Sequence, residues 1–188
     1  KTLEKIITTT RRAEIFYQIL NLYIGNDISD KKILIIGPRN IHELFIAWLY
    51  GYKWKNIYAI DLYSTNRKIK VMNMEEMEFD NSIFDCVSMS ATLVYAKDIK
   101  KAIAEVSRIL KPEGTFVFSA TYDPDSKNLW PQSAVTGTAI HKILVDLSLN
   151  VLFWKSVDKV NTKGYRQTSH YIAVCKDVNK NNLDFVNL

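Results

Sequence analysis

The sequence lacks the features that mark membrane-spanning and secreted proteins. None of its apolar runs approaches the roughly 20 residues that a helix needs to cross a bilayer. The first 20 residues form an amphipathic stretch with charges throughout, which is unlike a signal peptide. We therefore expect a cytoplasmic protein that does not use a membrane.

Residues that bind metals or form disulfides are also scarce. Only two cysteines occur, and both Cys86 and Cys175 lie in apolar, strand-like stretches, so two reduced core thiols are expected. The three histidines, His42, His141 and His170, lie far apart and show no metal-ligand spacing. No metal site is predicted.

What is present is the composition of one globular domain. The 188 residues are 47% hydrophobic and 24% charged, which suits a single compact core. The net charge of +5 is spread along the chain without a dense basic block. A surface that attracts phosphates remains open, but a generally solvated, lysine-rich surface is the simpler interpretation.

The hydrophobic pattern predicts strands alternating with helices. Four helices are expected, and the first is Glu4–Tyr23. The second follows Asn40 and has one apolar stripe, made by Ile41, Leu44, Phe45 and Trp48. The third is capped by Asp98 and buries Ile99, Ala102, Ile103, Val106 and Leu110, and the fourth has one apolar face, made by Ile140, Ile143, Leu144 and Leu147. Lys111–Gly114 should end the third helix and turn the chain. The expected strands are 33–36, 57–60, 68–72, 84–89, 115–119, 151–154 and 171–175.

This alternation predicts an α/β fold. We expect a doubly wound, mostly parallel seven-stranded sheet with helices on both faces and an antiparallel last strand. Residues 1–30 should form an N-terminal helical cap, residues 31–176 the core, and residues 177–188 a polar tail.

In such a sheet, ligands bind at the carboxyl ends of the strands. The first strand ends at Gly37, where a glycine permits a tight turn and close approach to a ligand before a helix N-terminus. The second strand ends at Asp61, whose carboxylate could accept both hydroxyls of a ribose. A solvent-facing aspartate is the alternative interpretation.

The order of short segments resembles class I S-adenosylmethionine-dependent methyltransferases, and most closely their small-molecule and natural-product members. The resemblance extends from about Lys31 to Lys176 and is most specific where Arg108-Ile-Leu-Lys-Pro-Glu-Gly114 precedes a strand. It is also carried by 33–37, 57–62, 73–79, 82–87 and 102–106.

The resemblance implies S-adenosylmethionine as cofactor and assigns residues to it. Gly37 and its neighbour Pro38 would hold the methionine end, and Asp61 would bind the ribose hydroxyls. The others implied are Leu62 against the adenine, Asn73 at the adenine amino group, the backbone N–H of Met74 at an adenine nitrogen, and Ser90 near the reacting methyl group.

The first motif departs from the family pattern. Ile35 stands where an acidic residue is usual, and Arg39 and Ile41 replace the second and third glycines. Arg39 could instead pair with the cofactor carboxylate, because a guanidinium suits a planar anion, or it could fill the space and abolish binding. Glu43, one turn into the helix, could take over the contact to the cofactor amino group.

The predicted reaction is methyl transfer to a small-molecule or sugar acceptor through an oxygen. A general base is needed only for a neutral acceptor group, and His141 and Asp123 are the candidates, although His141 could equally be a surface residue. Trp130 could form an acceptor wall, and Tyr95 could face the site or pack.

Other functions remain open. Loss of the motif glycines would suit an inactive binding or scaffold module of the same fold. A nucleic-acid methyltransferase is less favoured because Ser90-Ala-Thr-Leu93 stands where an Asn-Pro-Pro-Tyr motif would follow the fourth strand. A nicotinamide-dependent oxidoreductase would require the Gly-x-Gly-x-x-Gly turn, which is absent. A second copy of the chain is a possible partner.

Overall fold

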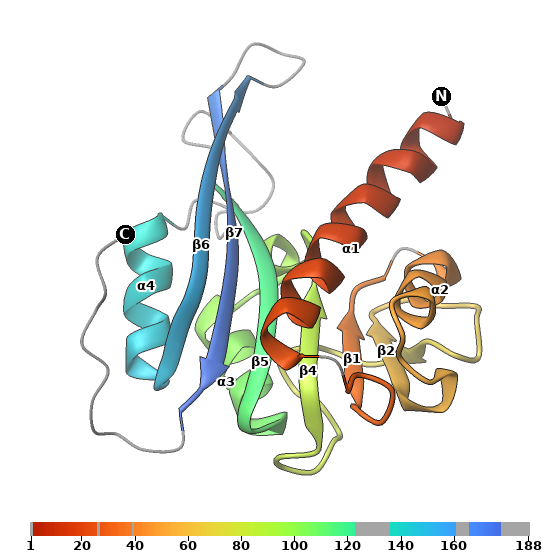
Figure 1. The fold of residues 1–188 in the computed structure, drawn as a ribbon. Helices are drawn as coiled ribbons and strands as arrows, with labels where there is room; N and C mark the ends of the chain where they lie inside the picture. The colour runs from red at the N-terminus through yellow and green to blue at the C-terminus, as the bar shows by residue number, and fades with distance from the viewer. Residues whose placement is uncertain (1, 26, 39, 123–135, 161–165, 178–188) are drawn as a thin grey trace.

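The computed structural model describes residues 2–25, 27–38, 40–122, 136–160 and 166–177 (Figure 1). Within these ranges, none of the helices combines the length and the apolar character that a bilayer span requires.

A seven-stranded sheet forms the centre of the molecule, with the strand order β3-β2-β1-β4-β5-β7-β6. All neighbouring pairs are parallel except those that β7 makes with β5 and β6. The predicted sheet and its antiparallel last strand are therefore confirmed. The strands are β1 (Ile33–Ile36), β2 (Ile57–Asp61), β3 (Lys70–Val71), β4 (Phe84–Met89), β5 (Leu110–Tyr122), β6 (Leu149–Val160) and β7 (Arg166–Lys176).

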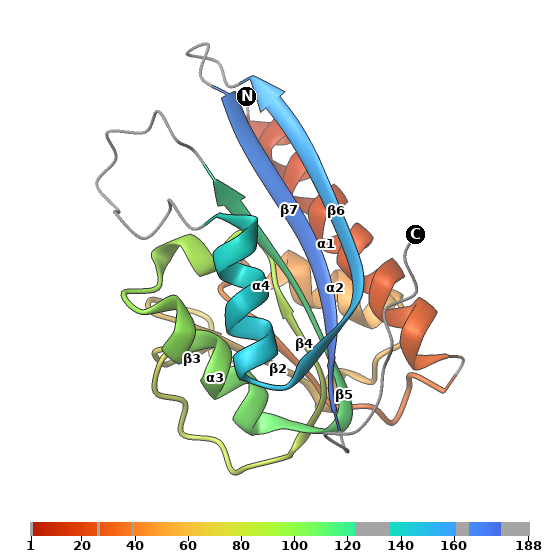
Figure 2. The same ribbon diagram turned by 90° about the vertical axis from the view of Figure 1, so that its left-hand side faces the viewer.

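Helices cover both faces of the sheet, as predicted (Figure 2). One apolar cluster joins α1 and α2 to the sheet, and the other joins α3 and α4 to the opposite face. The helices are α1 (Thr2–Ile24), α2 (Ile41–Leu49), α3 (Ile99–Ile109) and α4 (Gly137–Asp146), with short 3₁₀ turns η1 (Trp54–Asn56) and η2 (Leu93–Tyr95).

The N-terminal helix packs into the apolar cluster on one face of the sheet. Phe16, Tyr17 and Leu20 on α1 are fully buried in the cluster that contains Ile33 and Ile35 of β1. The Tyr17 hydroxyl donates to the backbone oxygen of Glu43 at 3.1 Å. Helix α1 therefore packs directly under the first turn of α2, which leads into the candidate site.

Helix α2 differs from the predicted stripe. Leu44 is buried as expected, but Phe45 and Trp48 are 46% and 52% exposed. The buried face is instead made by Glu43, Leu44, Ile46 and Ala47. Because this helix is apolar around much of its circumference, its period does not select one face, and packing against α1 does. Phe45 stacks on Trp54, with ring centroids 5.1 Å apart.

Several strand boundaries also differ. The predicted turn at Lys111–Gly114 lies inside β5, as an irregularity in its pairing with β4: Phe84 pairs with Leu110, but Cys86 pairs with Thr115. Glu113 has φ of 62° there, so the predicted turn residues form an irregular segment within β5 between the two pairings. Leu110, predicted on the buried face of α3, begins β5.

The β6–β7 hairpin is much longer than the two short strands predicted. The backbones of the two strands hydrogen-bond to each other along polar stretches as well as apolar ones, so the pairing continues beyond the apolar residues. At the other edge of the sheet, β3 is only two residues long, and the remainder of the predicted 68–72 strand lies outside it. Neither change alters the strand order.

Candidate functional site

A cavity of about 260 Å³ opens at the carboxyl ends of β1, β2 and β4. This is the edge of the sheet where ligands of doubly wound folds bind. The residues lining it are Ile36, Gly37, Glu43, Ile60, Asp61, Leu62, Met72, Met74, Ser90, Ala91, Thr92 and Tyr95.

The turn after β1 leaves no room for a side chain at Gly37. Its φ is +69°, and its N–H donates to the Ile60 oxygen at 2.8 Å, which fixes the turn to β2. A Cβ at this position would lie 2.3 Å from both Cγ2 and Oγ1 of Thr92. The Thr92 hydroxyl also lies within hydrogen-bonding distance of the carbonyl oxygens of Gly37 and Ser90, at 3.4 and 3.2 Å. A glycine is therefore required at position 37 for two reasons: the positive φ of its backbone, and the lack of space for a Cβ beside Thr92.

Helix α2 brings a carboxylate to the cavity. Asn40 caps the helix, and its Oδ1 accepts the His42 backbone N–H at 2.9 Å. Glu43 follows in the first turn, is 5% exposed and lines the cavity. A negative charge is favourable at this end of the helix, because the first backbone N–H groups point toward it.

A second carboxylate comes from the end of β2. Asp61 lines the cavity half-buried, and its Oδ1 accepts the Tyr63 N–H at 3.3 Å. Leu62 beside it is 61% exposed and also lines the cavity. Carboxylates and apolar surface thus lie within one cavity.

The segment after β3 supplies an apolar wall. Met72 and Met74 are buried and line the cavity. Asn73 between them is exposed and is not among the lining residues. Its Oδ1 accepts the Glu75 N–H at 3.0 Å, so this oxygen, expected to meet an adenine amino group, is engaged within its own loop.

The segment after β4 forms the remaining wall, with Ser90, Ala91, Thr92 and Tyr95. Ala91 has φ of 56°, a conformation that is uncommon for a residue with a side chain, and its N–H donates to the Ser119 hydroxyl at 2.9 Å. The bond to β5 helps hold this segment against the cavity.

The cavity therefore unites six of the residues that the sequence singled out for cofactor binding: Gly37, Glu43, Asp61, Leu62, Met74 and Ser90. Pro38 is buried and outside the lining. Arg39 lies outside the described residues, as do Asp123 and Trp130.

The catalytic candidate His141 is not among the cavity residues. It is exposed on α4, with its ring centroid 6.4 Å from that of Trp154. Sequence reasoning missed Ile36, Ile60, Met72, Ala91 and Thr92. The strand-end rule could have found the first three, whereas nothing in the sequence indicates that Thr92 packs on Gly37.

Comparisons with known proteins agree with the fold. Residues 42–118, from the start of α2 to within β5, match a family model described as a methyltransferase domain. No curated protein matches the sequence.

Among solved structures, a SAM-dependent methyltransferase from Methanosarcina mazei is 19% identical, with a TM-score of 0.64 over 86% of this chain and 98% of that one. The N-methyltransferase NodS from Bradyrhizobium japonicum is 17% identical, with a TM-score of 0.66 over 90% and 97%. A geranyl diphosphate C-methyltransferase from Streptomyces coelicolor, solved with Mg²⁺, geranyl diphosphate and S-adenosyl-L-homocysteine, is 15% identical, with a TM-score of 0.65 over 85% and 78%.

The family match and the shared fold confirm the predicted resemblance to class I S-adenosylmethionine-dependent methyltransferases. The family match covers residues 42–118, and the solved structures share the fold.

Proposed function

We propose that this methyltransferase-fold chain binds S-adenosylmethionine in the cavity described above and transfers its methyl group to an oxygen of a small-molecule or sugar acceptor. The observation that carries the proposal is one cavity that combines the Gly37 turn, two carboxylates and an apolar wall. A cofactor made of a flat base, a ribose and an amino acid requires these three kinds of surface.

The residues fit that cofactor. The Asp61 carboxylate would accept the two ribose hydroxyls, and Leu62 and Met74 would contact the adenine. Glu43 would pair with the cofactor amino group and so replace the acidic residue that the family usually has at the position of Ile35. Its burial and its place at a helix N-terminus support this role, because water screens a buried charge pair less.

The remaining assignments complete the amino-acid end of the cofactor. Gly37 would allow close approach of the backbone, with Pro38 shaping the turn, and Arg39 would pair with the carboxylate. Ser90 would line the cavity near the reacting methyl group, and the Asn73 oxygen, which can accept a second hydrogen bond beside the one from the Glu75 N–H, would face the adenine amino group.

Little further chemistry is required of the protein. S-adenosylmethionine supplies a methyl group already activated on a sulfonium, so the protein must mainly align the acceptor and exclude water. For a hydroxyl acceptor, a base that removes the proton would assist, and His141 and Asp123 are the proposed bases.

The charge of the cavity favours a small acceptor over a nucleic acid. Among the described residues, the lining contains two acidic side chains and no lysine or arginine. A site for DNA or RNA requires cations along the phosphates. We therefore propose a small-molecule acceptor, and the cytoplasmic location and pairing with a second copy of the chain stay proposals that the cavity does not address.

Calorimetry with S-adenosylhomocysteine tests the proposal. The wild-type protein should bind, and Asp61→Asn should weaken binding by about 10- to 100-fold, because hydrogen bonds to a charged group contribute about 1.5–3 kcal/mol. Asp30→Asn is the matched control, because Asp30 pairs with Lys53 on the surface and is not among the cavity residues.

No heat at high micromolar ligand would refute cofactor binding. Binding without methyl transfer from labelled cofactor to a panel of hydroxyl, amine and thiol compounds would favour a binding module over an enzyme. Transfer only to amines or thiols would refute the oxygen acceptor.

A further inference from the structure

Two walls of the cavity come from segments that are distant in sequence. Met74 lies on the loop after β3, whereas Tyr95 lies in η2 after β4. Neither segment is a regular strand or a long helix, so no regular element fixes the distance between Met74 and Tyr95. That distance depends on contacts between the two segments.

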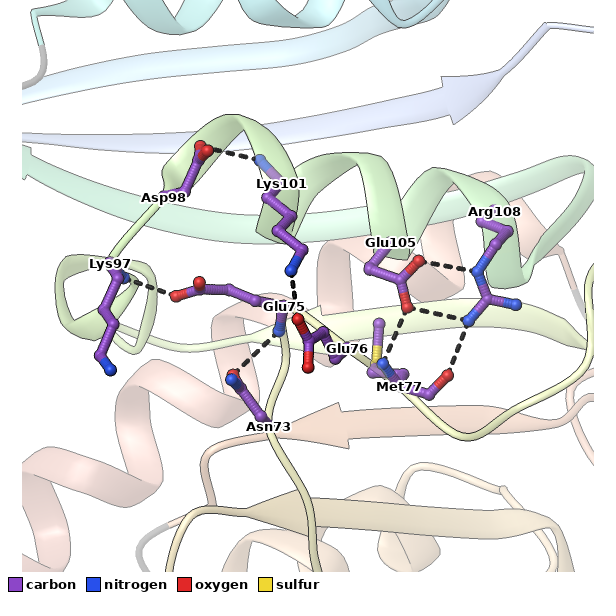
Figure 3. Close-up of polar contacts among 9 residues, drawn as sticks. All are labelled: Asn73, Glu75, Glu76, Met77, Lys97, Asp98, Lys101, Glu105 and Arg108. Carbon is purple, nitrogen blue, oxygen red and sulfur yellow. Dashed lines mark hydrogen bonds and ion pairs between the residues drawn. The ribbon is translucent and has the colours of Figure 1, made fainter.

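Glu75 joins the two segments directly. It is 7% exposed, and its Oε1 accepts the backbone N–H of Lys97 at 2.5 Å (Figure 3). Lys97 lies just after η2 and just before α3. Glu75 itself is not among the cavity residues, so it acts on the cavity only through its neighbours in sequence and through this bond.

The loop fixes the direction of Glu75. The Asn73 side chain accepts the Glu75 N–H at 3.0 Å, and the Asn73 carbonyl accepts the Glu76 N–H at 3.2 Å. These bonds close a tight turn that directs the Glu75 carboxylate toward Lys97 (Figure 3), and Met74 in the same turn lines the cavity. An Asx turn of this kind is typical of asparagine.

A separate anchor holds the far end of the same loop on α3. Glu105 accepts the Met77 N–H at 2.8 Å, and Arg108 donates to the Met77 oxygen at 2.8 Å (Figure 3). Arg108 also donates to the Phe79 oxygen at 2.7 Å. The loop therefore does not depend on Glu75 to stay on the protein. What Glu75 adds is the bond to the segment that carries Tyr95.

We propose that Glu75 is a positioning residue that sets the spacing between the Met74 and Tyr95 walls and thereby the affinity for the nucleoside part of the cofactor. This inference rests on the proposed function. Removal of the carboxylate leaves the Lys97 N–H without this acceptor and releases one wall from the other. Glutamine retains an acceptor oxygen of the same reach, so Glu75→Gln should preserve the spacing.

The test compares Glu75→Ala, Glu75→Gln and Glu105→Ala. Glu105→Ala is the matched control, because Glu105 is also a glutamate that accepts a backbone N–H of this loop, but at the far anchor. Each variant is titrated with S-adenosylhomocysteine and with 5′-methylthioadenosine, which lacks the amino-acid part. Urea unfolding of each variant reports its stability.

We expect Glu75→Ala to weaken both ligands by a similar factor of about ten, because a backbone donor loses its charged acceptor. Glu75→Gln should stay within about threefold of wild type, and Glu105→Ala should unfold at lower urea yet bind normally. An equal loss for both ligands would assign the effect to the nucleoside end.

Unchanged affinity in Glu75→Ala would overturn the inference, and so would an equal loss in Glu105→Ala, which would mean that loop stability alone matters. A loss confined to S-adenosylhomocysteine would also overturn it. If wild type binds neither ligand, the proposed function itself fails and the inference falls with it.

Discussion

Replacement of Gly37 by alanine tests whether the turn after β1 is built around a residue without a side chain. The perturbation has two parts. At φ of +69°, an alanine is in the left-handed region, which costs about 1–2 kcal/mol. Its Cβ would also lie 2.3 Å from two Thr92 atoms, and overpacking of this kind typically costs about 1–3 kcal/mol.

The expected loss of unfolding free energy for Gly37→Ala is therefore about 2–5 kcal/mol, a large part of the roughly 5–15 kcal/mol that holds a domain folded. Gly25→Ala is the matched control. Gly25 has φ of +78°, but a Cβ there would meet no atom within 4 Å, so only the backbone cost of about 1–2 kcal/mol should appear.

Urea unfolding followed by circular dichroism measures both variants. Thr92→Ala provides the second check, since it removes the two atoms at 2.3 Å and leaves Cβ at 2.8 Å. In the double variant, Thr92→Ala should recover at least about 1 kcal/mol of the Gly37→Ala loss. If Gly37→Ala costs no more than Gly25→Ala, or if Thr92→Ala recovers nothing, the assigned contact is wrong.

Two further predictions concern the polar anchor and the buried thiol. Arg108→Lys should lower the unfolding free energy by about 1.5–3 kcal/mol in urea titrations, because one ammonium cannot reach both Met77 and Phe79 as the guanidinium does; a loss below about 0.5 kcal/mol would contradict this. Burial raises the pKa of Cys86 from 9.0 to about 12, so iodoacetamide at pH 8 should label it only in unfolded protein, as mass spectrometry would show. The pKa of Cys86 is higher in the folded protein than in the unfolded chain. The neutral thiol therefore makes its full contribution to the unfolding free energy below pH 9, and this contribution is lost between pH 9 and 12. Cys86→Ala should reduce that decline, by up to about 1.4 kcal/mol per pH unit, and an unchanged decline would exclude Cys86 as a source.

Much of the fold was predictable because local chemistry and tertiary structure agree. Asp98 was predicted as an N-cap, and its Oδ1 accepts the Lys101 N–H at 3.0 Å. Ile99, Ala102, Ile103 and Val106 were predicted as one buried face of α3, and all are buried. Where a segment had no clear polar face, as in α2, the prediction for Phe45 and Trp48 was wrong.

Most of the candidate site was predictable because it follows strand ends, with Glu43, one turn into α2, as the exception. Gly37 and Asp61 terminate neighbouring parallel strands, so their meeting follows from the strand order alone. Asn73 follows the same rule, yet its side chain is used within the loop. The direction of a loop side chain depends on nearby backbone donors, which the order of strands does not specify.

The sequence alone determined the alternation of strands and helices, the sheet that follows from it, and the edge where a ligand would lie. These depend on hydrophobic periodicity and on rules of chain connection, which act over short distances along the chain. Only the tertiary structure decided that Thr92 packs on Gly37 and that Glu75 reaches Lys97. Such contacts join segments 22 to 55 residues apart, and they are set by the strand pairing and loop conformations that form only when the whole chain packs.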